Sequence, residues 1–315
     1  DAGLETMKRT FPVSIVIPAY NAARFITKTL DSVKAQTFKE YEVIVVDDGS
    51  LDNTGEIVGN YIRIHGLVGQ CIRQENKKIA GARNTGIKFA RGEYIALLDH
   101  DDLWYPNKLQ VVLDKFKLHP EVDLIGHNLF MVKGGKKKGV LKTGTASSNM
   151  YKKLLFTRSF LSPSAVVFKK EKALEIGGFR ENHEFVTVED YDFWMRLSKV
   201  AKFYFIKKIL GEYIIVETGA SKKIEYHHKN IEFLLRDHFA SYFGNNPGLF
   251  DRMRMRRRLS VVYRSALHLT IKYKQDSRKQ QEYFVKMMKE FPFDFKNMAV
   301  ALFWIGTVLS KKLSV

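Results

Sequence analysis

The segment EYIALLDHDDLWYP, residues 93–106, passes from an apolar stretch directly into three carboxylates, Asp99, Asp101 and Asp102. The apolar part has the composition of a buried strand, and the carboxylates follow at its end. Like charges this close repel one another, and each loses hydration on leaving water, so the cluster requires a compensating cation. A divalent metal ion is the usual partner of such a group.

The sequence around this segment alternates between short apolar runs and stretches with helical periodicity. In the stretch 22–36, for example, Ile26, Leu30 and Val33 recur at helical spacing. The predicted strands are 13–18, 41–48, 68–74 and 93–99, and the predicted helices are 22–36, 53–65 and 80–90. This rhythm is typical of an α/β protein with a mostly parallel sheet and helices on both of its faces.

Polar loops follow three of the predicted strands. They are PAYN (18–21), DDGS (47–50) and DHDD (99–102). Because parallel strands end at the same edge of a sheet, and such sheets bind ligands there, we expect the three loops to open on one edge. A simpler interpretation of the second loop is a helix cap supplied by Asp48 or Asp52.

After residue 132 the regular alternation ends. The glycines and lysines of 133–144 are typical of an exposed hairpin or loop. Acidic residues at the start of the helix predicted over 188–201 are also explained by the helix dipole alone. The other predictions here are a strand, a short helix and a Gly-Gly stop within 162–179, and strands over 202–207 and 211–218.

The composition limits the class of protein. A chain of 315 residues that is 45% hydrophobic can bury a large core, so it is expected to be globular. Its one cysteine, Cys71, cannot form an intramolecular disulfide, which favours a buried thiol and a reducing compartment. Residues 1–10 are predicted to be a tag remnant or a disordered terminus. The net charge of +18 indicates an anionic partner, which could be nucleic acid, a membrane surface or a phosphorylated substrate.

Much of the positive charge lies in 222–315, where three or four helices and no strands are predicted. This region holds 19 Lys or Arg against 8 Asp or Glu, with the densest patch at 252–258, RMRMRRR. The apolar run 298–309 would span about 18 Å as a helix, short of the ~30 Å hydrocarbon core, so it should lie in a membrane surface rather than cross it. Alternatively, its apolar residues pack onto the protein or onto a second copy in a homo-oligomer; these residues are Leu302, Phe303, Ile305, Val308 and Leu309.

Several of these segments together resemble one family. They are VSIVIPAYN, YEVIVVDDGSLDNT, AGARNTGIKFARGEYIALLDHDD, SPSAVVFKKEKALEIGGF and VEDYDFWMRL, and they occur in the order and spacing of family 2 glycosyltransferases. These are inverting enzymes with the Rossmann-like GT-A fold that build bacterial surface polysaccharides and lipopolysaccharides. The resemblance covers about residues 11–216 and implies a catalytic domain at 11–221, with a basic helical extension at 222–315.

The resemblance also implies a nucleotide-sugar site. Pro18, Tyr20 and Asn21 would surround the base, and the carboxylate of Asp48 would accept the imide N–H of a uracil. Arg83 would face the ribose or phosphates of the donor, although an ordinary surface arginine on a helix is the alternative.

The DxD element of the family corresponds to Asp99 and Asp101. Asp101 would be the direct ligand of Mn²⁺ or Mg²⁺, and Asp99 would lie closer to the ribose. Few protein ligands are needed, because the donor's diphosphate and water complete the coordination sphere. The cation would stabilise the charge that builds on the leaving phosphate.

Inversion requires a base for the attacking hydroxyl, and the resemblance assigns this role to Asp190, with Glu189 as the second choice. Asp192 would hold the helix start or an acceptor group. The chain departs from the family at 216–223, VETGASKK, which lacks the arginine and the histidine that reach the diphosphate in many relatives. Either Lys222 or Lys223 substitutes for them, or this contact is absent.

The expected partners are a nucleotide-sugar donor, a glycan or lipid-linked acceptor and an anionic membrane surface at the inner face of the cytoplasmic membrane. Two other functions compete with this one. The basic helices could bind nucleic acid, although their aromatic residues also suit helix packing and carry no recognised motif. The chain could also be a non-catalytic sensor of sugar nucleotides, which the intact Asp48, Asp101 and Asp190 argue against.

Overall fold

The computed structural model describes residues 12–216, 224–244, 246–273 and 276–313. The predicted terminal segment 1–10 and the motif stretch 217–223 lie outside these residues. The chain forms two compact units. The first comprises 1–151, 159–182 and 189–217, and the second comprises 152–158, 183–188 and 218–315.

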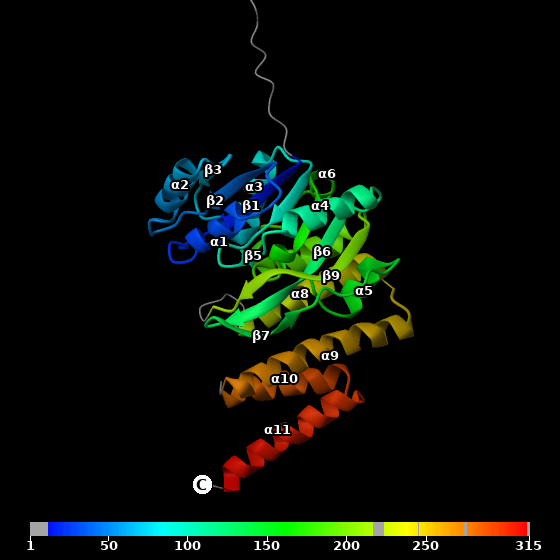
Figure 1. Ribbon diagram of the computed structural model, residues 1–315. Coiled ribbons are helices and arrows are strands. Elements are labelled where there is room, and N and C mark those ends of the chain that lie inside the picture. The colour runs from blue at the N-terminus through cyan, green and yellow to red at the C-terminus, as the bar shows by residue number, and fades with distance from the viewer. Residues whose placement is uncertain (1–11, 217–223, 245, 274–275, 314–315) are drawn as a thin grey trace, which may run out of the picture. The chain divides into compact units, whose positions relative to one another are not determined.

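The first unit is built on one nine-stranded sheet (Figure 1), in the order β3-β2-β1-β4-β8-β6-β9-β5, with β7 paired to β6. The strands are β1 (Val13–Ala19), β2 (Tyr41–Asp47), β3 (Gly69–Arg73), β4 (Tyr94–Leu97), β5 (Leu103–Trp104), β6 (Leu124–Lys133), β7 (Lys136–Leu141), β8 (Val166–Lys169) and β9 (Phe203–Ile214). Strands β1 to β4 pair in parallel, as the sequence predicted. Beyond β4 the sheet is mixed, because β8 runs antiparallel to both β4 and β6.

This topology places several strand ends at one edge. Since β8 is antiparallel to both of its neighbours, β4 and β6 run in the same direction. Strand β9 pairs in parallel with β6. The carboxyl ends of β1, β2, β4, β6 and β9 therefore lie at the same edge of the sheet, and the polar loops of the sequence extend from it.

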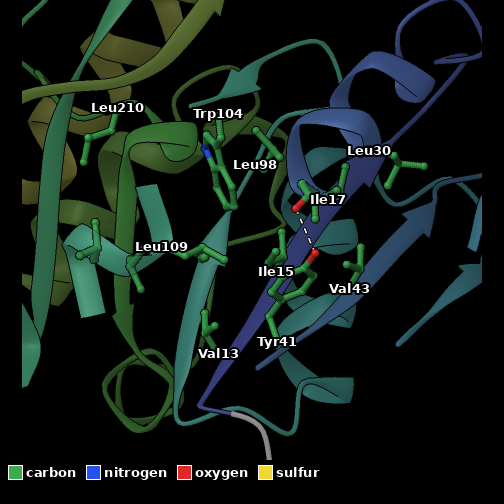
Figure 2. Packing of buried hydrophobic residues seen from close by; sticks show 14 of the residues in the cluster. Val13, Ile15, Ile17, Leu30, Tyr41, Val43, Leu98, Trp104, Leu109 and Leu210 are labelled. Carbon is green, nitrogen blue, oxygen red and sulfur yellow. Dashed lines mark hydrogen bonds between the residues drawn. The ribbon is translucent and has the colours of Figure 1, made fainter. Parts of the chain in front are cut away.

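Helices cover both faces of the parallel strands, which confirms the predicted α/β class. Val13, Ile15 and Ile17 of β1 face a core that includes Leu30 of α1 (Figure 2). On the opposite face α3 approaches so closely that a Cβ on its Gly86 would lie 2.2 Å from Val16. The helices of this unit are α1 (Ile26–Lys34), α2 (Thr54–His65), α3 (Lys78–Phe89), α4 (Lys108–Leu118), α6 (Lys170–Glu175) and α7 (Glu189–Leu197), with α5 (Met150–Phe156) at its boundary.

The apolar residues that recur at helical spacing in α1 form its buried face. Ile26, Leu30 and Val33 are buried along one stripe, as their spacing predicted. The hydroxyl of Tyr41 on β2 donates to the Val33 carbonyl at 3.0 Å (Figure 2), which ties the end of the helix to the sheet.

The end of the sheet differs from the prediction at one point. The two strands predicted over 202–207 and 211–218 are one continuous strand, β9, with Gly211 inside it. A Cβ at Gly211 would lie 2.5 Å from the carbonyl oxygen of Leu103 on the neighbouring β5. The glycine therefore permits close strand contact rather than marking a break. The exposed hairpin predicted over 133–144 is confirmed as β6–β7, which turns at Gly134 and Gly135.

The second unit contains four long helices in its described residues, in agreement with the predicted three or four. They are α8 (Ile224–Phe243), α9 (Leu249–Lys272), α10 (Ser277–Glu290) and α11 (Phe295–Leu313). Leu234, Leu259, Leu267 and Met287 are buried among them. Within the described part of the chain, none of the helices combines the length and hydropathy that crossing a membrane requires.

Candidate functional site

The loop after β1 is joined to the loop after β2. Asn21 takes a left-handed backbone conformation, with φ 49°, and its N–H donates to Ser50 Oγ at 3.0 Å. Its side-chain oxygen accepts the N–H of Leu51 at 2.8 Å. The neighbouring Tyr20 remains 44% exposed, so its ring is open to a ligand at this edge.

Asp48 is buried and anchored by one of its two carboxylate oxygens. Oδ1 accepts from Gln74 Nε2 at 2.7 Å and from the N–H of Lys77 at 2.8 Å. No described residue donates a hydrogen bond to Oδ2. The capping alternative is not borne out as stated, because the N-cap residue of α2 is Asn53 and it makes no side-chain cap hydrogen bond, although Asp52 just before it accepts the N–H of Thr54. Capping of α2 does not account for Asp48 either, because the backbone N–H that Asp48 accepts belongs to Lys77, just before α3. Oδ2 of Asp48 therefore stays available to a hydrogen-bond donor of a ligand.

The acidic loop after β4 meets the same edge. His100 Nδ1 lies 3.2 Å from the carbonyl oxygen of Pro18, which accepts a hydrogen bond when the histidine carries a proton on Nδ1. The N–H of Asp99 donates to Ser164 Oγ at 3.0 Å. The prediction that the three loops open on one edge of the sheet is therefore confirmed.

The three carboxylates of this loop occupy different environments. Asp102 is fully buried, and its Oδ1 accepts the N–H of Ile214 at 2.8 Å. Burial, and to a smaller extent repulsion from Asp99 and Asp101, raises the pKa of Asp102 well above the usual range. Asp101 is half-buried, and its pKa is raised first by burial. Asp102 therefore serves the fold, whereas Asp101 forms no salt bridge with a lysine or arginine among the described residues, and the charge of the neighbouring His100 opposes the rise in its pKa.

Arg83 connects the acidic loop to the acidic start of α7. Its Nη2 donates to Asp99 Oδ1 at 2.9 Å and its Nη1 donates to Glu189 Oε1 at 2.8 Å. The arginine side chain is only 2% exposed, so this is a buried bridge rather than a surface arginine. Both terminal nitrogens hold protein carboxylates, and the predicted contact with donor phosphates remains a prediction.

Asp190 lies next to the bridged Glu189. The Asp190 carboxylate accepts the N–H of Tyr191 at 2.6 Å. Burial and then the charge of Glu189 raise the pKa of Asp190 to about 7. A carboxylate with such a pKa can both hold and release a proton near neutral pH.

Asp192 plays a structural part in the same helix. It is fully buried and accepts from Arg196 Nε at 2.7 Å. The same arginine donates to the carbonyl oxygens of Ile176 and Gly178. Asp192 thus fixes α7 against the Gly-Gly turn, consistent with the expected role at the start of this helix.

The site also uses residues that sequence reasoning missed, namely Gln74, Lys77, Ser164 and Arg196. Gln74, Lys77 and Ser164 each orient a carboxylate or its loop through a contact between segments far apart in the chain, whereas Arg196 holds Asp192 within α7. Only Arg196 carried a local signal, because it follows Asp192 at the i,i+4 spacing of a helical ion pair.

The carboxylates of the acidic loop suit a metal ion that takes most of its ligands from a bound diphosphate and water. Among the described residues no group of three or more His, Cys, Asp or Glu side chains could enclose a metal ion. Asp101 and the second oxygen of Asp99 supply hard oxygen ligands for an ion completed by phosphate and water. The residues therefore fit Mn²⁺ or Mg²⁺ bound together with a diphosphate.

Solved structures with a similar fold place the chain in the GT-A type of α/β fold. Staphylococcus aureus TarS 1-349 in complex with UDP-GlcNAc has a TM-score of 0.59 at 18% identity, with 94% of this chain and 92% of that chain covered. Mannosyltransferase PcManGT of Pyrobaculum calidifontis, in complex with GDP-Man and Mn²⁺, has a TM-score of 0.57 at 17% identity, with 94% and 87% covered.

The family follows from the sequence comparisons. The model of Glycosyl transferase family 2 matches residues 14–177, and the chain belongs to this family. The chain is 34% identical over 224 residues to the amylovoran biosynthesis glycosyltransferase AmsB of Erwinia amylovora, which covers 66% of this chain and 71% of that protein. It is 32% identical over 227 residues to an uncharacterized glycosyltransferase of Rickettsia felis, where the match covers 70% of this chain but only 37% of the relative's length.

Proposed function

We propose that this chain transfers a sugar from a nucleoside diphosphate donor, UDP-sugar in the first instance, to a hydroxyl of a glycan or lipid-linked acceptor with inversion. The observation that carries this proposal is the Arg83 bridge, which brings the acidic loop of Asp99 and Asp101 to the acidic start of α7. A metal-binding loop and a base beside it are the two elements that such a displacement needs.

The base of the nucleotide is assigned to the edge between Tyr20 and Asp48. The free Oδ2 of Asp48 can accept an N–H from a base held against the exposed Tyr20 ring. Uracil and guanine both present such an N–H. The UDP and UDP-GlcNAc complexes of TarS support uracil, and the GDP-Man complex of PcManGT makes GDP-sugars the comparison to include.

Asp101, with Asp99, is assigned to Mn²⁺ or Mg²⁺. The bound cation would stabilise the negative charge that develops on the leaving diphosphate. Arg83 holds Oδ1 of Asp99, and Ser164 Oγ accepts the N–H of the same residue. These contacts keep the acidic loop in place before the donor binds.

Asp190 is assigned as the base that takes the proton of the attacking hydroxyl. Glu189, the alternative, has Oε1 held by Arg83 and is buried, so its geometry favours a positioning role. The proton leaves the acceptor hydroxyl as its oxygen bonds to the anomeric carbon from the face opposite the diphosphate.

The test is a thermal-shift and turnover panel. UDP-GlcNAc, UDP-galactose, UDP-glucose and GDP-mannose are added with and without Mn²⁺, because a ligand that binds the native state raises Tm. Asp101→Asn should lose the Mn²⁺-dependent shift, whereas Asp190→Asn should keep it and lose sugar transfer. Asp114→Asn, an exposed substitution in α4, is the matched control and should behave as the unmodified protein. A normal Mn²⁺-dependent shift in Asp101→Asn, or normal turnover in Asp190→Asn, would contradict the assignment.

We also propose that the second unit attaches to an anionic membrane surface. An apolar ridge of exposed side chains runs from the start of α11 along this helix and comprises Phe293, Phe295, Met298, Leu302 and Phe303. Beside it a pocket of about 450 Å³ is lined in part by Arg257, Arg264 and Lys296, and the two arginines pair with Asp294 in the same pocket. Exposed apolar side chains next to cations suit an interfacial position on anionic lipid. The side chains of Val308 and Leu309, which the prediction also included, lie outside the described residues.

Vesicle sedimentation separates this attachment from self-association. Phe293→Ser/Phe295→Ser/Leu302→Ser should abolish binding to vesicles containing phosphatidylglycerol, and binding should weaken with salt. Leu249→Ser/Phe250→Ser, which replaces exposed apolar residues of α9, is the matched control. Light scattering that shows a dimer dissociated by the ridge substitutions, with no vesicle binding, would instead assign the ridge to a second copy of the chain.

A further inference from the structure

We infer that the β6–β7 hairpin binds the acceptor and that this acceptor is an anionic glycan, bearing carboxylates or phosphodiesters. The inference rests on the proposed function and names its acceptor class. The hairpin carries a basic cluster of exposed side chains, Lys133, Lys136, Lys137 and Lys138. We call it the basic hairpin.

The basic hairpin lies at the catalytic edge of the sheet. Val132 of β6 pairs with Ile214 of β9, and the Ile214 N–H donates to the carboxylate of Asp102 at 2.8 Å. Lys133 follows Val132 along β6, and Lys137 on β7 lies opposite Val132. With strands about 4.8 Å apart and about 3.3 Å per residue, the base of the hairpin is within roughly 10 Å of Asp102.

The turn of the hairpin brings two lysines face to face. Gly134 and Gly135 have φ of 55° and 74°, which gives a tight two-residue turn that sets Lys133 directly opposite Lys136. Like charges facing each other across an antiparallel pair are destabilising. A register shift after Met131 inserts Lys138 as an additional residue, and such bulges redirect side chains.

Three of the four lysines of the basic hairpin, Lys136, Lys137 and Lys138, carry uncompensated charge in the described part of the chain. The sequence contains no Asp or Glu between Asp123 and Glu171. Within the described parts of the chain, no carboxylate forms an ion pair with Lys136, Lys137 or Lys138. The ammonium of Lys137 lies 4.0 Å from the centre of the Phe130 ring, which supports its stem but provides no counter-charge. An anionic ligand would supply what is missing.

The same lysines could protect an edge strand or contact a membrane. Lysine on an exposed edge prevents strand-to-strand association, and β7 is such an edge. That role does not need the charges to face one another at the turn. Membrane insertion is disfavoured because the tip consists of glycine and lysine, without the apolar side chains that enter lipid. The position beside Asp102 favours the acceptor.

The test measures binding of three defined oligosaccharides at about 0.15 M salt, where long-range attraction is screened. The probes are hexagalacturonate, which carries carboxylates, a glycerol phosphate hexamer, which carries phosphodiesters, and neutral maltohexaose. Lys136→Gln/Lys137→Gln/Lys138→Gln removes the charge of the basic hairpin. Lys88→Gln/Lys115→Gln/Lys117→Gln removes the same charge from α3 and α4 and is the matched control.

We expect at least one anionic probe to bind more tightly than maltohexaose, and the hairpin variant to lose about tenfold in affinity for it, while the control stays within about twofold. The preferred anionic probe identifies carboxylate or phosphodiester as the recognised group. Equal losses in both variants, or equal binding of maltohexaose, would overturn the inference.

Two further outcomes would also overturn it. Aggregation of the hairpin variant with unchanged oligosaccharide affinity would assign the lysines to edge protection. Loss of vesicle binding with unchanged oligosaccharide affinity would assign them to a membrane. The sugar-nucleotide panel of the proposed function, measured with Mn²⁺ on all three proteins, separates the two. Absence of any Tm shift in the unmodified protein contradicts the proposed function, whereas a normal shift in all three proteins with unchanged oligosaccharide affinity contradicts the inference alone.

Discussion

Arg83 Nη1 and Glu189 Oε1 lie 2.8 Å apart, although 106 positions separate the two residues in the chain. Through its other terminal nitrogen the same guanidinium holds Asp99. This one buried cation therefore fixes the distance between the loop assigned to the metal and the helix assigned to the base. The planar fork of arginine matches two carboxylates at once, which lysine cannot do.

Replacing Arg83 should destabilise the fold and stop transfer. Arg83→Met leaves two carboxylates without their partner, and breaking a buried ion pair in this way costs about 3–5 kcal/mol. The free energy of unfolding, measured in urea, is the readout. Lys202→Gln, which breaks a half-exposed pair with Glu121, should cost less than about 1 kcal/mol. A similar small loss in Arg83→Met would show that the bridge does not form.

The pH dependence of turnover should report Asp190. Burial and the charge of Glu189 raise its pKa to about 7, and a base must be deprotonated to act. The value of kcat/KM should therefore fall as pH drops below about 7. In Glu189→Gln the repelling charge is gone, so the pKa of Asp190 decreases and the profile moves to lower pH.

Steady-state rates between pH 5 and 9 measure this shift, at roughly half-unit steps that resolve a single titration. Glu175→Gln, an exposed substitution at the end of α6, is the control and should leave the profile in place. A profile that Glu189→Gln moves toward higher pH would exclude Asp190 as the titrating base.

The order and spacing of the elements could be predicted from the sequence, because they depend on local periodicity. Strands β1 and β2 and the buried stripe of α1 each carry their pattern within a few residues. Gly211 shows the limit of that reasoning. Alone it resembles a break, and only its approach to Leu103 on β5 reveals why the strand continues.

In the candidate site, the acidic residues could be predicted from the sequence, whereas their contacts could not. The acidic residues at strand ends stood out because buried strands rarely finish in carboxylates. Their partners did not, since Arg83 reaches Asp99 and Glu189 through the tertiary fold. Sequence reasoning assigned Asp101 to the metal and gave Asp102 no role, and the hydrogen bond from Ile214 on β9 assigns Asp102 to the fold.

Removing the charge of Asp190 should stabilise the protein above neutral pH. Its pKa is raised in the folded state, so the folded protein binds this proton more tightly than the unfolded chain does. The associated stability is complete below the unfolded pKa of about 3.9 and is lost as pH rises through about 7. Asp190→Asn, which keeps an oxygen to accept the Tyr191 N–H, avoids that loss. Its Tm should exceed that of the unmodified protein at pH 8, and the difference should close toward pH 4; an equal Tm at both would contradict the raised pKa.

Lys108 gives the last prediction, because it is a fully buried lysine outside the site. Its Nζ has no hydrogen-bond partner among the described residues and lies 3.4 Å from the centre of the Trp104 ring. Burial lowers its pKa well below the usual range, so the unfolded chain binds this proton more tightly than the folded protein. Stability therefore rises with pH up to the unfolded pKa near 10.4 and is reduced at neutral pH.

Lys108→Met keeps the unbranched shape and removes the amine, so it should raise Tm at pH 7 by about 2–4 °C. The gain should shrink as pH approaches about 10.4, where the unmodified protein no longer loses stability through this group. Lys117→Met, at an exposed position of the same helix, should change Tm little at either pH. Calorimetry across this pH range measures both variants. A lower Tm for Lys108→Met at pH 7 would show that the buried amine has a stabilising partner and is not merely tolerated beside Trp104.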